Sequence, residues 1–113
     1  MKGFPARVRQ EIGYSLYHAQ VGTKHRLAKP LRGLGSGVLE VISDHRGDTF
    51  RAVYTVRFKA AVYVLHAFQK KAKRGIATPK REMDVVKRRL KQAEAHYQAN
   101  YVEGYTDAPN QRG

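Results

Sequence analysis

The chain has no cysteine and no long apolar run. The missing thiols exclude a disulfide framework, a cysteine-ligated metal and thiol chemistry, and they fit a reducing cytoplasm. No apolar segment approaches the roughly 20 residues that a membrane-spanning helix needs. The first residues, MKGFPARVRQ, also lack the apolar centre of a secretory signal. We therefore expect a cytoplasmic protein with no membrane partner.

Acidic residues are scarce as well. The 9 Asp and Glu stand against 22 Lys and Arg, which leaves a net charge of +13 and a pI near 10.3. Such a field attracts RNA, DNA, a ribosome surface, anionic lipid or an acidic protein without distinguishing among them. A length of 113 residues predicts one domain, residues 1–113, with its core in residues 5–98 and a loose tail in residues 100–113.

Motifs for metals, cofactors and nucleophiles are missing too. None of the 5 histidines stands at metal-ligand spacing, and there is no phosphate-binding loop, nucleophile motif or carboxylate pair. We therefore expect no metal and no small-molecule cofactor. RNA cleavage requires neither, because the 2′-hydroxyl of the substrate is the nucleophile. The protein has only to orient it, move protons and stabilise the charged phosphate.

Periodicity predicts a helix, a three-stranded meander and a second helix. The first helix covers Pro5–Gln20, and a glycine-rich loop follows over Thr23–Gly37. The strands and turns follow in the order Val38–Ser43, a hairpin turn at Asp44–Asp48 with Gly47 at positive φ, Thr49–Arg57, a turn at Lys59–Ala60, and Ala61–Phe68.

The second helix begins at Thr78 and Pro79, with Thr78 as its cap. Its apolar stripe consists of Met83, Val86, Leu90, Ala93 and Tyr97. The element order indicates an α+β domain, a small antiparallel sheet packed by an N-terminal helix and a C-terminal helix. We expect both helices on one face of the sheet.

Ten cations crowd into residues 70–91, where only Glu82 and Asp84 oppose them. A charge run is as often a solvated face as a binding site. A loop at the edge of a sheet, however, holds lysines where phosphate can reach them. The cations are Lys70, Lys71, Lys73, Arg74, Lys80, Arg81, Lys87, Arg88, Arg89 and Lys91.

Arg51 is the strongest single candidate for contact with a phosphate. It alternates with an apolar set that includes Tyr54, so Arg51 and Arg57 face an open side of the sheet if the helices cover that set. The lysine cluster would meet them there, and a guanidinium can stabilise charge developing on a phosphate. The alternatives are an arginine without function or an ion pair with Glu40.

His66 and Tyr54 are candidates for proton transfer, each with a simpler alternative. His66 alternates with Val64 and Phe68, and a histidine in an apolar strand is more often a hydrogen-bonded core residue than a catalyst. Tyr54 is equally typical of a packed aromatic residue with a solvated hydroxyl. RNA contacts are expected from a further set of cations: Arg32, Arg46, Arg57, Arg74, Lys80 and Arg81.

Three segments resemble the phage-derived HigB-like toxins of the RelE/ParE superfamily. They are KPLRGLGSGVLEV (29–41), FRAVYTV (50–56) and VLHAFQKKAKRGIATPKRE (64–82), the third being the most specific, and the resemblance extends over roughly Pro5 to Ala95. It implies a compact sheet with two N-terminal helices and one C-terminal helix. It also implies a bacterial toxin that cleaves mRNA in the ribosomal A site without metal and is neutralised by a helix-turn-helix antitoxin.

The resemblance also assigns residues. Arg51 matches an arginine that RelE-like toxins place at the phosphate, and Lys70, Lys71 and Lys73 match the basic cluster after the last strand. Two departures are visible. Many relatives carry an arginine two residues after the strand glutamate, where this chain has Ile42, and relatives often begin with a strand before the first helix.

The residues and the resemblance together predict a metal-independent, ribosome-dependent mRNA endoribonuclease. Its expected partners are mRNA on the ribosome and a helix-turn-helix antitoxin. Two alternatives stay open: a ParE-like inhibitor of DNA gyrase, and a non-catalytic module that binds RNA or the ribosome.

Overall fold

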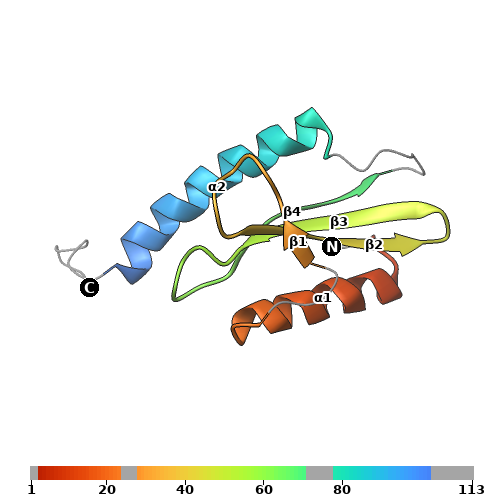
Figure 1. The fold of residues 1–113 in the computed structure, drawn as a ribbon, viewed down its shortest axis with the longest axis horizontal. Coiled ribbons are helices and arrows are strands. Elements are labelled where there is room, and N and C mark those ends of the chain that lie inside the picture. Colours follow the sequence, from red (N-terminus) through yellow and green to blue (C-terminus); the bar gives the residue numbers. More distant parts are fainter. Residues whose placement is uncertain (1–2, 24–27, 71–77, 103–113) are drawn as a thin grey trace.

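The computed structural model describes residues 3–23, 28–70 and 78–102. The elements are α1 (Ala6–Gln20), β1 (Ala28–Pro30), β2 (Val38–His45), β3 (Asp48–Thr55), β4 (Tyr63–Lys70) and α2 (Lys80–Tyr101) (Figure 1). The predicted α+β class is confirmed. Within the described ranges α1 is the one helix that precedes the sheet. The structure adds β1, which lies inside the segment predicted as loop.

The sheet is antiparallel, with four strands in the order β1-β2-β3-β4. The predicted hairpin between β2 and β3 is confirmed. It turns at Arg46 and Gly47, with φ of 51° and 86°, the pair of positive angles that suits a two-residue hairpin. The short β1 pairs with β2 from Ala28 opposite Val41 to Pro30 opposite Leu39. The meander is therefore extended by a short edge strand.

The two helices lie on opposite faces of the sheet (Figure 1), so the expectation that they share one face is wrong. Both faces of the strands are apolar, and each therefore needs a covering layer. The cluster on the α1 side comprises Val8, Ile12, Ala28, Val41, Phe50, Ala52 and Tyr54. The cluster on the α2 side comprises Leu31, Val38, Val53, Leu65, Phe68, Val86, Leu90 and Ala93.

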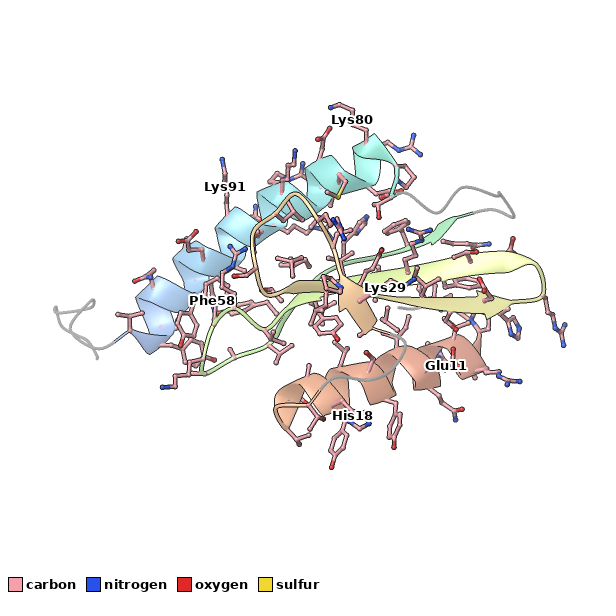
Figure 2. The ribbon with its side chains drawn as sticks, in the orientation of Figure 1. Glu11, His18, Lys29, Phe58, Lys80 and Lys91 are labelled. Atoms are coloured by element: carbon pink, nitrogen blue, oxygen red, sulfur yellow. The ribbon has the colours of Figure 1, made fainter. Side chains whose placement is uncertain are left out.

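Helix α2 buries the predicted stripe through Val86, Leu90 and Ala93. Its cationic side faces outward, with Lys80 and Lys91 projecting away from the sheet (Figure 2). The helix continues through Tyr101, two residues into the predicted tail, and residues 103–113 lie outside the described ranges. In the described part of the chain, no helix has the length and apolar character to span a bilayer.

Candidate functional site

A β-bulge in β4 turns His66 toward α2. The register pairs Val53 with His66 and Tyr54 with Val64, so Leu65 has no partner on β3. Directly paired residues share a face of an antiparallel sheet. His66 therefore lies with Val53 on the α2 side, whereas Val64 lies with Tyr54 on the α1 side. The bulge interrupts the alternation that the sequence predicts and aims the imidazole at the helix.

Both ring nitrogens of His66 contact α2. Nε2 lies 2.6 Å from Glu82 Oε1, and Nδ1 lies 3.2 Å from Arg89 Nη1. A guanidinium only donates hydrogen bonds, so Nδ1 accepts and Nε2 donates its proton to Glu82. Arg89 also donates to the Leu65 carbonyl at 3.1 Å, and the imidazole stacks on Phe68 with ring centroids 5.1 Å apart. The side chains of His66 and Glu82 are 15% and 18% exposed, so the pair is largely buried but still reaches solvent.

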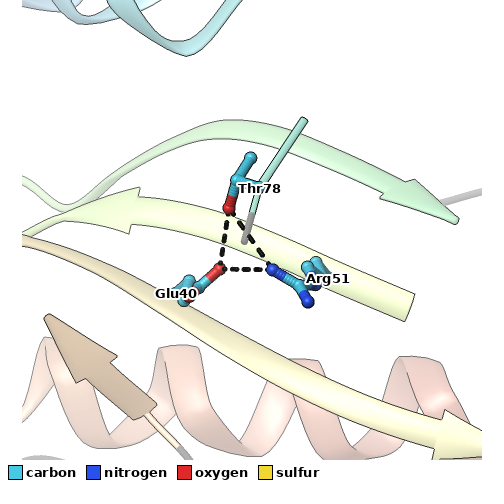
Figure 3. Close-up of polar contacts among 3 residues, drawn as sticks. All are labelled: Glu40, Arg51 and Thr78. Carbon is cyan, nitrogen blue, oxygen red and sulfur yellow. Dashed lines mark hydrogen bonds and ion pairs between the residues drawn. The ribbon is translucent and has the colours of Figure 1, made fainter. Parts of the chain in front are cut away.

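A second polar group joins β2, β3 and the start of α2 (Figure 3). Arg51 Nη1 lies 3.5 Å from Glu40 Oε1 and 3.3 Å from Thr78 Oγ1. The Thr78 hydroxyl donates to the same Glu40 oxygen at 3.4 Å. The Arg51 side chain is 2% exposed, and its Nε, though buried, has no hydrogen-bond partner among the described residues. All three contacts are long, and the buried guanidinium is only partly satisfied.

This geometry corrects two predictions. Arg51 does not lie on an open face, because α2 covers the side of the sheet to which Arg51 and Val53 belong. The alternative of an ion pair with Glu40 is confirmed. Thr78 does not cap α2 either: the cap position is Pro79, no side chain caps the helix, and the Thr78 hydroxyl is used by Arg51 and Glu40.

The predicted lysine cluster falls largely outside the described residues. Lys71, Lys73 and Arg74 lie in the gap between residues 70 and 78, and of Lys70 only the backbone is described, at the end of β4 opposite Thr49. A shared anion site between these cations and Arg51 therefore stays a prediction.

Tyr54 does not join His66. It is fully buried on the α1 face of the sheet, and its hydroxyl lies 3.5 Å from Ser15 Oγ. The sheet separates it from the α2 side, so Tyr54 and His66 do not lie together, and a role of Tyr54 in proton transfer stays a prediction. Its expected hydroxyl contact with solvent is wrong, because helix α1 covers that face.

Arg57, also expected on an open face, is exposed and holds the glycine-rich loop. Its Nε donates to the Ser36 carbonyl at 3.0 Å, and its Nη2 donates to the Leu34 carbonyl. The remaining described cations among the predicted RNA contacts are exposed: Arg32, Arg46, Lys80 and Arg81. Lys80 pairs with Asp84 at 3.4 Å, an exposed i,i+4 pair of small energetic weight.

Sequence reasoning missed the partners of His66. Glu82 and Arg89 are seven residues apart, which places them on one side of a helix, and this spacing was the available signal. What the spacing could not show is that β4 presents His66 to that side. The described residues contain no group of three or more His, Asp or Glu side chains able to hold a metal ion.

Another histidine contact lies near the far end of α2. His96 Nδ1 is 2.7 Å from the Tyr63 hydroxyl, so a second histidine hydrogen bond joins α2 and β4. Desolvation, with smaller contributions from Tyr101 and Tyr97, raises the pKa of Tyr63 above its ordinary value. Tyr63 therefore stays protonated at neutral pH and acts as a hydrogen-bonding group.

Most of the described residues belong to a segment that matches a known protein family. Residues 1–91 match the family of phage-derived Gp49-like proteins (DUF891). The chain belongs to this family. Searches of curated proteins and of solved structures found no match. The Gp49-like match covers α1, the whole sheet and α2 as far as Lys91. The groups centred on His66 and on Arg51 both fall inside it, whereas His96, Tyr97 and Tyr101 lie beyond it.

Proposed function

We propose that this Gp49-like protein is a HigB-like toxin of a type II toxin–antitoxin system and cleaves mRNA on the ribosome. Membership of a phage-derived family supports this, together with the resemblance of residues 64–82 to RelE/ParE toxins. The net charge of +13 suits an RNA-bearing target in the cytoplasm. The partner that the proposal requires is a helix-turn-helix antitoxin.

The observation that carries the proposal is the contact of His66 with Glu82 and Arg89. A carboxylate on one ring nitrogen orients an imidazole and stabilises the imidazolium that forms when the other nitrogen accepts a proton. In the free protein Arg89 occupies that other nitrogen, Nδ1. A phosphate can draw the guanidinium away, because a charge-assisted bond to phosphate is stronger than one to a neutral imidazole.

The proposed reaction follows from this exchange. Arg89 binds the scissile phosphate, and the freed Nδ1 of His66 accepts the proton of the RNA 2′-hydroxyl. The 2′-oxygen attacks phosphorus and the bond to the 5′-oxygen breaks, which gives a 2′,3′-cyclic phosphate and a 5′-hydroxyl. The leaving oxygen takes its proton from the ammonium of one of Lys70, Lys71 and Lys73. Arg51 contributes to the phosphate only after its pair with Glu40 separates, so we assign the first contact to Arg89.

The test is mRNA cleavage by purified protein on translating ribosomes. We expect His66→Ala to lower the cleavage rate by about a hundredfold or more, the usual worth of a general base, and Glu82→Gln to lower it by a smaller factor. His96→Gln is the matched control, because it removes a histidine that also bridges α2 and β4. Wild-type cleavage by a folded His66→Ala variant would refute the assignment of the base.

The same preparations separate the alternatives. Inhibition of gyrase supercoiling with intact mRNA would replace the proposal with ParE-like gyrase inhibition. Salt-sensitive RNA binding without cleavage would indicate a binding module. A steep dependence of binding on salt does not by itself discriminate among them, because every protein that binds a polyanion shows one.

A further inference from the structure

The outer side of α1 carries large side chains exposed to solvent. Tyr14, Tyr17 and Val21 are 57%, 55% and 54% exposed, and their spacing of three and four residues puts them on one stripe. The Tyr14 ring lies 6.3 Å from the Tyr17 ring and 4.7 Å from the His18 ring. Single exposed apolar residues need no explanation, but a contiguous patch marks an interaction site.

A cleft of about 590 Å³ opens at the end of this helix. One wall is formed by residues around Gln20 and Gly22, and the other by the connection from β3 to β4, residues Val56–Val62. Val21 stands between Gln20 and Gly22 in the chain without lining the cleft itself, so the exposed stripe ends beside the cleft. Val56, in the opposite wall, is 38% exposed. The cleft is large enough to receive apolar side chains of a partner.

The charges select the kind of partner. Among the described residues that form the stripe and the cleft, here called the α1 surface, none is acidic, and Lys59 lines the cleft. A second copy of this chain also carries +13 and is repelled. RNA is a poorer match, because α2, which carries the exposed cations, lies across the sheet from α1 (Figure 1). An apolar segment with acidic flanks would pack against the exposed rings and be attracted by the positive charge of the chain.

We propose that the α1 surface docks an acidic amphipathic helix of a partner protein. The stripe from Tyr14 to Val21 spans about two helical turns, roughly 10 Å. A partner helix of about four turns covers it and sets an apolar side chain into the cleft against Val56, the helix-in-groove mode of recognition. The surface and His66 lie on opposite sides of the sheet, so docking does not depend on the nuclease chemistry. Only the identification of the occupant as the antitoxin rests on the proposed function.

The test uses a fluorescein-labelled synthetic helix of about four turns, with leucines along one side and glutamates on the others. Binding is followed by fluorescence anisotropy against the full chain. A scrambled peptide of equal composition measures the attraction due to charge alone. We expect the amphipathic peptide to bind at least about tenfold tighter than the scrambled one, and Tyr17→Ala combined with Val21→Ser to abolish the difference.

Tyr101→Ala is the matched control, because Tyr101 is a 49% exposed tyrosine on the other helix, and it should leave the difference intact. Equal binding of the two peptides, or an undiminished difference in the α1 double variant, would overturn the proposal. Two further results would overturn it in favour of another occupant. Self-association of the chain that the double variant abolishes would indicate a second copy, and single-stranded RNA binding that only the double variant weakens would indicate RNA. mRNA cleavage by the double variant reports on the proposed function separately.

Discussion

Arg51 brings three parts of the fold together through one buried charge. Its guanidinium contacts Glu40 on β2 and Thr78 just before α2, while its own backbone belongs to β3. A buried ion pair adds little net stability, because desolvation offsets the attraction, but removal of one partner leaves an uncompensated charge. The same residue can thus be essential for folding without touching any substrate.

Glu40→Ala should lower the free energy of unfolding by about 3–5 kcal/mol, because Arg51 would remain buried without its partner. The double variant Glu40→Leu/Arg51→Met should recover most of this loss, because it removes both charges and keeps the volume. Urea denaturation measures both values. A double variant as unstable as Glu40→Ala would show that the loss does not come from an uncompensated buried charge.

At the scale of elements, the glycine-rich loop is held against the end of β3. Gly37 has a φ of +80°, and an added Cβ would lie 3.1 Å from the Arg57 Cα. Its carbonyl accepts hydrogen bonds from Thr55 Oγ1 at 2.7 Å and from the Val56 N–H at 2.8 Å. The loop therefore has a precise backbone conformation at this point, and glycine provides it.

We expect Gly37→Ala to lower the free energy of unfolding by about 1–2 kcal/mol from the left-handed conformation alone, with the close contact to Arg57 adding to the loss. Gly13→Ala is the control, because Gly13 lies inside α1 with nothing within 4 Å of an added Cβ. It should raise stability by about 0.5–1 kcal/mol. Equal effects of the two substitutions in thermal denaturation would show that the loop does not constrain Gly37.

For the whole molecule, the sheet separates two different surfaces. The α2 side carries exposed cations that include Lys87 and Arg88, and the α1 side carries the aromatic stripe with Tyr14 and Tyr17. If RNA binds on the α2 side, Arg88→Ala should reduce the slope of log K against log salt by about 0.7 for a single strand, because one fewer counterion is released. Arg7→Ala, an exposed cation on α1, should leave the slope unchanged. Equal reductions would show that RNA does not distinguish the two sides.

The regular elements were predictable because their signals are local. The helical spacing from Val8 to Ala19, the alternation around Arg51, and Pro79 at the start of α2 each predict their element with bounds close to the observed ones. The three-residue β1 was missed, since a strand so short has almost no periodicity. His66 was a candidate from its residue type, but its partners Glu82 and Arg89 became visible only when α2 was placed against β4.

Residue type and spacing along single segments were enough to predict the α+β class, the order of the strands in the meander, the buried stripe of α2 and the strongly positive field. Contacts between distant segments were needed to show that the helices cover opposite faces, that Arg51 is enclosed, and that a bulge at Leu65 directs His66 to α2. When strands are apolar on both sides, their sequence pattern does not predict which helix packs on which face of the sheet. That choice is made by packing between segments far apart in the chain, and it determines which charges stay in water.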